Sequence, residues 1–110
     1  MKTYIDKSIK VGSIVTGFYK GYWRVLEFID LSDRIYNRSE IPLIVGELAL
    51  DRNGNIVRKR TQRRWSLGWS RRVTKERVES INTGGNEIFE RQKQNIMQIV
   101  VDSEQKKVVL

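Results

Sequence analysis

A β-hairpin is predicted by the stretch PLIVGELALDRNGN, residues 42–55 of this 110-residue chain. Leu43–Leu50 is an apolar run of strand length that starts directly after Pro42, and proline is tolerated at the first residue of a strand. The dipeptide Asn53-Gly54 follows. It is the strongest short-range hairpin signal. We therefore expect residues 43–50 and 56–64 to be antiparallel partners.

Two further strands are predicted before this hairpin. Residues 11–17 are a β-branched run bracketed by glycines, and residues 22–30 alternate with apolar side chains on both faces. Apolar residues on both faces indicate a strand in a curled sheet that packs on two sides for part of its length. The polar stretch 31–40 is predicted to be a loop, and residues 1–10 an extended lead-in or a short edge strand.

Two helices are predicted after the sheet. Thr74 is a suitable N-cap for a short helix that continues through Asn82 and ends at the glycine pair 84–85. Asn86 is a suitable N-cap for a second helix to about residue 101, and acids in its first turn suit the helix dipole. The side chains expected to face inward are Val73, Val78 and Ile81 from the first helix, and Ile88, Phe89, Ile96, Ile99 and Val100 from the second.

The second helix is expected to dock on the sheet, although its apolar stripe also fits a dimer or partner face. The tail, residues 102–110, ends in an apolar triplet and either adds a strand or stays loose. The length predicts a single domain over residues 1–110.

Residues 12–28, GSIVTGFYKGYWRVLEF, resemble the opening hairpin of small SH3-like barrels of the KOW and Tudor kind. Gly21 corresponds to the glycine that KOW motifs place after the aromatic turn, whereas no Tudor methyl-lysine cage can be assigned. The resemblance spans about residues 10–75 and implies a mainly-β barrel of about five strands, with helical residues 74–101 as a C-terminal addition.

Composition excludes several kinds of site. The chain has no Cys and no His, which removes disulfides, thiolate catalysis, Cys-based metal centres and the commonest general base. We therefore expect no enzyme activity, no metal and no cofactor, and no small-molecule substrate is evident. No apolar run approaches the ~18 residues of a membrane helix, and the N-terminus lacks a signal-peptide pattern. A cytoplasmic protein without membrane contact is the expectation.

Positive charge is concentrated in one segment of a chain whose formal net charge is +8. Residues 52–77 hold ten basic side chains and one acid, Glu76, whereas the rest of the chain holds 11 basic and 12 acidic residues. Eight of the ten are arginine, which favours bidentate contacts to phosphate or carboxylate. The ten are Arg52, Arg58, Lys59, Arg60, Arg63, Arg64, Arg71, Arg72, Lys75 and Arg77.

This segment predicts a non-catalytic module that binds nucleic acid, either DNA or RNA. Clustered cations neutralise phosphates and release counterions without reading base sequence, and exposed indole rings stack on unpaired bases. Lys59, Lys75 and Arg77 would widen the positive field. The residues predicted to bind are Arg58, Arg60, Arg63, Arg64, Trp65, Trp69, Arg71 and Arg72.

Alternatives remain open for each part of this hypothesis. Trp65 and Trp69 could close the core, and the arginines could form a solvated face or bind an acidic protein surface. A short basic chain without Cys or His also resembles accessory proteins of bacteriophages, which implies an interaction or inhibitor protein acting on a host protein. Tyr19, Tyr22 and Trp23 form a second aromatic group, which is either a binding platform or part of the core.

Overall fold

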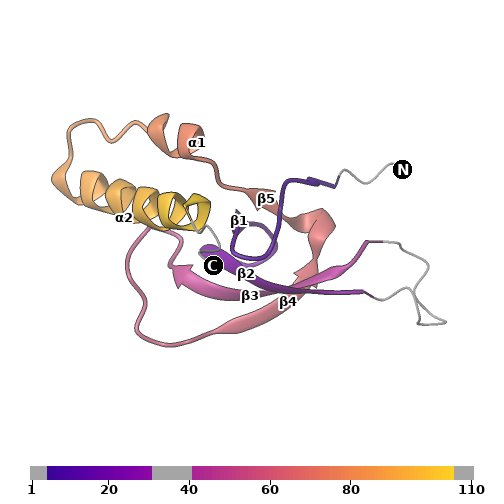
Figure 1. The fold of residues 1–110 in the computed structure, drawn as a ribbon. Helices are drawn as coiled ribbons and strands as arrows, with labels where there is room; N and C mark the ends of the chain where they lie inside the picture. The colour runs from indigo at the N-terminus through magenta and orange to yellow at the C-terminus, as the bar shows by residue number, and fades with distance from the viewer. Residues whose placement is uncertain (1–4, 31–40, 106–110) are drawn as a thin grey trace.

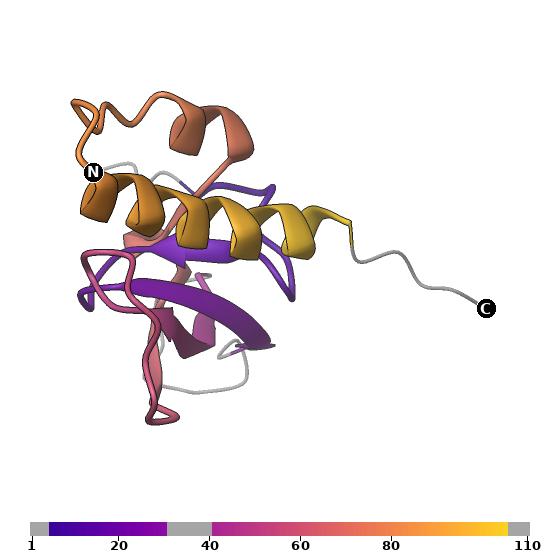
Figure 2. The same ribbon diagram turned by 90° about the vertical axis from the view of Figure 1, so that its left-hand side faces the viewer.

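A computed structural model describes residues 5–30 and 41–105, and shows a curved five-stranded antiparallel sheet with α2 lying across one face (Figures 1 and 2). The strand order is β4-β3-β2-β1-β5, and the sheet is not closed. The structure therefore shows a mainly-β, α+β fold with an open sheet, and a closed barrel is not part of it. The elements are β1 (Ile14–Thr16), β2 (Tyr22–Ile29), β3 (Leu43–Leu50), β4 (Gln62–Ser66), the 3₁₀ helix η1 (Leu67–Trp69), β5 (Arg71–Arg72), α1 (Lys75–Glu79) and α2 (Glu87–Glu104).

The two faces of the sheet contribute side chains to two separate hydrophobic cores. The first core lies within the curve of the sheet and contains Ile9, Val15, Trp23, Val25, Ile44, Trp65 and Leu67. The second lies between the opposite face and the two helices and contains Ile14, Leu50, Val73, Val78, Ile96 and Val100. Neighbouring residues of β2 join different cores, with Trp23 in the first and Tyr22 against the second. The prediction that this strand packs on two sides is confirmed.

The first strand and the turn of the predicted hairpin are confirmed, but the second strand is not. β3 has the predicted bounds, and the turn after it is closed by Asp51, whose carboxylate accepts the N–H groups of Asn53 and Asn55 at 2.9 Å each. Leu50 bridges to Ile56, but the next strand residue opposite β3 is Gln62, which pairs with Glu47. A continuous strand over residues 56–64 is therefore wrong. Residues 58–61 offer no apolar side chain, and strand pairing resumes at Gln62, in the strand that buries Trp65.

Both predicted helix caps are confirmed. Thr74 Oγ1 accepts the N–H of Arg77 at 3.2 Å, and Asn86 Oδ1 accepts those of Ile88 and Phe89 at 2.9 and 3.1 Å. α1 ends at Glu79 and is therefore shorter than predicted. Ile81 lies beyond its end and is 38% exposed, although it was expected to be buried. α2 docks on the sheet through its middle and C-terminal part, whereas its first turn exposes two of the residues expected to face inward, Ile88 and Phe89.

The predicted loop at residues 31–40 and the last five residues of the tail lie outside the described residues. Residues 102–104 of the tail continue α2. In the part of the chain that the structure describes, neither helix combines the length and apolar character that a membrane span requires.

Gly54 allows the turn after β3 to pack closely against α2, and we expect its replacement by alanine to destabilise the fold. Gly54 has a φ of +92°, and a Cβ there would lie 2.9 Å from the Gln92 carbonyl oxygen and 3.0 Å from Ile96 Cδ1. Asn95 Nδ2 also donates to the Gly54 carbonyl at 3.0 Å. Backbone strain and displacement of the helix should together cost at least about 2 kcal/mol of unfolding free energy, measured by urea denaturation.

Gly84 provides a matched control for this substitution. Its φ is +61°, and a Cβ there would meet no atom within 4 Å, so Gly84→Ala carries backbone strain without a collision. It should lose about 1 kcal/mol. Equal losses in the two variants would contradict the packing of the turn against α2.

Candidate functional site

The ten cations of residues 52–77 separate into three groups according to the elements that carry them. The first group occupies the turn and loop between β3 and β4. The second, Arg63 and Arg64, lies on β4 at the outer edge of the sheet. The third lies on β5 and α1. The first group is Arg52, Arg58, Lys59 and Arg60, and the third is Arg71, Arg72, Lys75 and Arg77.

Three members of the third group line an open groove of about 820 Å³, which we call the arginine groove. The walls come from the N-terminal segment, the end of β1, η1 with its flanks, β5 and α1. The groove exists because β5 pairs with β1, which brings Arg71 opposite Thr16 and places η1 beside the turn that follows β1. Its lining residues are Asp6, Thr16, Gly17, Gly68, Trp69, Ser70, Arg71, Arg72 and Arg77.

Hydrogen bonds fix η1 at the edge of the groove. Ser66 caps it by accepting the Gly68 N–H at 3.2 Å, and the Ser70 N–H donates to the Leu67 carbonyl at 3.0 Å. The buried indole of Trp65 donates to Ser70 Oγ at 2.7 Å. Leu67 enters the first core, so a turn this short directs Trp69 away from that core. Trp69 is consequently 66% exposed.

A chain of aromatic contacts connects this exposed indole to the interior. Phe18, which is 60% exposed, meets the ring of Trp69 edge-on at a centroid distance of 6.1 Å and Tyr19 at 5.0 Å. Tyr19 in turn contacts Trp23 and Trp65 at 5.9 and 5.8 Å. Edge-to-face geometry is the favoured arrangement for such pairs. The exposed Phe18–Trp69 pair is thus supported by the packed core rather than standing free.

Gly17 permits the close approach of this turn to η1. A Cβ on Gly17 would lie 2.1 Å from the backbone carbonyl oxygen of Trp69, a distance that no packed structure accommodates. A residue with any side chain would push the turn and η1 apart. The glycine is therefore part of the geometry that holds Phe18 against Trp69.

The electrostatic balance of the arginine groove is positive. Within residues 5–30 and 41–105, Arg71 and Arg77 form no ion pair with a carboxylate, and the one acid in the lining is Asp6. The hydrogen bond from the Ser8 hydroxyl lowers the pKa of Asp6 below its ordinary value, although burial opposes this, and the nearby Arg72 charge lowers it further. Asp6 is accordingly ionised at neutral pH and offsets part of the Arg72 charge.

The structure corrects one predicted binding residue and leaves others apart from the groove. Trp65 is 5% exposed and belongs to the first core, so the prediction that it could stack on a base is wrong. Its ring is buried because it lies over the backbone of Gly46 in the neighbouring strand. Arg63 and Arg64 border a separate hollow beside Val45, and a further hollow takes in Arg58 and Arg60. Trp69, Arg71 and Arg72 are brought together.

The second predicted aromatic group does not form one platform. Trp23 is buried, and Tyr19 and Tyr22 pack against different cores on opposite faces of the sheet. Phe18 was missed as a surface aromatic. Its signal in the sequence was a large apolar residue inside a turn bounded by Gly17 and Gly21, where no strand is available to bury it.

No protein-family model, no curated protein and no solved structure matches this chain.

Proposed function

We propose that the chain is a non-catalytic nucleic-acid-binding module whose principal contacts lie in the arginine groove. The observation that carries this proposal is the exposed Phe18–Trp69 pair beside two arginines that have no ion-pair partner among the described residues. Proteins that bind single strands combine a cationic groove along the backbone with aromatic faces for the bases. Arg71, Arg72 and Arg77 would hold phosphates, and Trp69 would stack on a base.

The fold proposal that accompanies this function is an SH3-like barrel of the KOW and Tudor kind, left open between β4 and β5. It is supported by the return of β5 to pair with β1 and by the curvature of the sheet around one core. Origin from a bacteriophage and a cytoplasmic location stay predictions from composition.

A salt series tests the function. Fluorescence anisotropy with labelled single- and double-stranded DNA and RNA should give an affinity whose logarithm falls linearly with the logarithm of salt concentration. Three arginine–phosphate contacts predict a slope of about −2 for a single strand. Absence of any binding tighter than ~10⁻⁴ M at ~50 mM salt, the range of weak non-specific binding, would contradict the proposal.

An acidic protein surface is the second candidate for the same groove. Trp and Arg are the residues most enriched at the energetic centres of protein interfaces, and both are exposed here. If polynucleotides fail to bind, capture of a partner from a nuclease-treated lysate separates this candidate from a groove without a macromolecular ligand.

Truncation of the exposed indole should weaken binding to unpaired nucleic acid. We expect Trp69→Ala to reduce single-strand affinity about tenfold, since stacking contributes ~1–3 kcal/mol per base, and to change duplex affinity much less. The variant should keep its thermal stability, because the side chain is mostly exposed. Equal losses for both nucleic-acid forms would contradict a stacking role, and anisotropy titrations at a single salt concentration measure both.

A further inference from the structure

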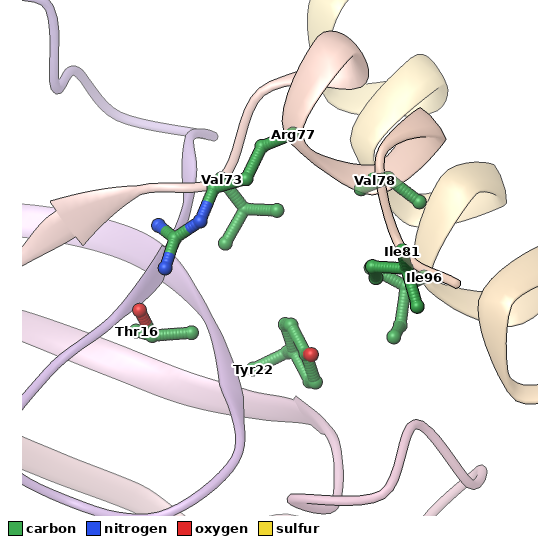
Figure 3. Close-up of a pocket in the computed structure, with 7 residues that line it drawn as sticks. All are labelled: Thr16, Tyr22, Val73, Arg77, Val78, Ile81 and Ile96. Carbon is green, nitrogen blue, oxygen red and sulfur yellow. The ribbon is translucent and has the colours of Figure 1, made fainter. Parts of the chain in front are cut away.

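A cavity of about 180 Å³ lies between the second face of the sheet and the helices, next to the arginine groove (Figure 3). Arg77 and Thr16 border both spaces, while the other residues that line the cavity do not line the arginine groove. The walls are contributed by β1, β2, α1, α2 and the connections around α1. The lining residues are Thr16, Tyr22, Val73, Arg77, Val78, Ile81 and Ile96.

The cavity has a polar end and an apolar end. Figure 3 shows the Arg77 guanidinium reaching toward the Thr16 side chain on one side, and Ile81 and Ile96 lying on the opposite side. Val78 and Ile96 belong to the second core, so the apolar end is held by packed residues. The Arg77 guanidinium has no ion-pair partner among the described residues. A cation over the mouth of an apolar cavity favours a ligand that is apolar at one end and anionic at the other.

The hydroxyl of Tyr22 adds a neutral donor to the lining. Burial raises the pKa of Tyr22 above its ordinary value, and the positive charge of Arg77 acts in the opposite direction. Tyr22 therefore stays protonated at neutral pH and is able to donate a hydrogen bond. Tyr22 is also packed against the second core, which restricts its ring to this position.

The size of the cavity sets the size of the apolar group. An engineered apolar cavity of about 150 Å³ in another protein binds benzene, so a volume of 180 Å³, only slightly larger, suits one six-membered ring better than a fused pair. From the volume and the placement of the polar groups, we infer that this cavity is a binding site for a small monocyclic acid. Its ring would lie among Val78, Ile81 and Ile96, and its carboxylate or phosphate would contact Arg77. The inference does not depend on the proposed nucleic-acid function.

Amide chemical shifts of the full chain, titrated with simple probes, test this site. Benzoate and phenyl phosphate carry the two anionic groups on one ring, benzyl alcohol is the neutral counterpart, and 2-naphthoate has a second ring. We expect saturable shifts at Val73, Val78 and Ile96 with at least one of the two monocyclic anions, and whichever binds more tightly identifies the class of acid. Both neutral benzyl alcohol and 2-naphthoate should bind at least about tenfold more weakly, given the strength of a charged hydrogen bond and of overpacking.

Two variants separate this site from an accidental gap in packing. Arg77→Gln should weaken the preferred anion about tenfold and leave benzyl alcohol within about twofold, because the neutral probe does not need the charge. Ile81→Trp fills the apolar end of the cavity and should abolish binding of the monocyclic probes, while polynucleotide binding remains, since Ile81 does not line the arginine groove.

Three results would overturn the inference. They are the absence of shifts at the lining residues with either anion at millimolar concentration, equal affinity of the preferred anion and benzyl alcohol, and unchanged anion binding in both variants. A loss of polynucleotide binding alone, with probe binding intact, would contradict the proposed function and leave this site standing.

Discussion

Gly46→Ala is expected to destabilise the protein by about 3 kcal/mol or more, although alanine is ordinarily the better residue in a strand. A Cβ on Gly46 would lie 2.3 Å from Cη2 and 2.8 Å from Cζ3 of the Trp65 ring. That ring has little room to move, because it meets Trp23 at a centroid distance of 5.3 Å and its Nε1 donates to Ser70. Displacing it loses the aromatic contact and the hydrogen bond together.

Chemical denaturation of a double-mutant cycle isolates this contact. The ring of phenylalanine is shorter than the indole, so Gly46→Ala should lose much less stability in a Trp65→Phe background than in the native chain. A coupling free energy of at least about 1.5 kcal/mol is expected for groups in direct contact. The same loss of stability in both backgrounds, or a gain of stability in the native chain, would contradict the claim that the Trp65 ring needs a residue without a side chain at Gly46.

The consequence of this contact extends to the arginine groove. Because Trp65 holds Ser70 and Ser70 ends η1, a displaced indole removes one of the restraints on Trp69. We therefore expect Gly46→Ala to lower single-strand affinity as well as stability, even though Gly46 does not line the groove.

Local signals in the sequence predicted the elements well. Thr74 and Asn86 cap helices as predicted, and Leu43–Leu50 has its predicted bounds. Each of these depends on chemistry within a few residues: a side-chain oxygen that accepts nearby N–H groups, or a proline followed by an apolar run. The strand predicted over residues 56–64 was wrong because alternation was judged without asking which side chains could be buried.

The choice between the two tryptophans could not be made from the sequence. Trp65 and Trp69 are four residues apart in the same basic segment, and both were candidates for stacking and for the core. The difference is set by a non-local contact: Trp65 pairs with Ile44, and its ring extends over Gly46, which has no side chain. A glycine inside a strand is a sign of close approach by another group, and this signal at Gly46 was available.

The positions of the cations in space could likewise not be predicted from local sequence patterns. Arg58 and Arg71 are both in the basic segment, yet one lies in the loop before β4 and the other on β5 at the opposite edge of the sheet. The pairing of β5 with β1 brings the third group to Asp6, Thr16 and Gly17, residues far away in the chain. Charge density along the sequence therefore overstated the size of a single cationic surface.

The central claim is that binding depends on the arginine groove and not on total charge. Two double variants with the same change in net charge distinguish these possibilities: R71E/R77E in the groove, and R58E/R60E in the loop before β4. Charges beyond about 10 Å are largely screened at 0.1 M salt, so a remote reversal has a limited effect on a local contact. All four side chains are exposed, so both variants should fold.

Affinity for a labelled single-stranded oligonucleotide at ~100 mM salt, measured for both variants and the native chain, is the most direct test. R71E/R77E is expected to lose at least about a hundredfold, since lost and reversed charge contacts amount to several kcal/mol. R58E/R60E should stay within about fivefold of the native chain. Equal losses in the two variants, or a larger loss for R58E/R60E, would contradict the claim that the groove is where the polyanion binds.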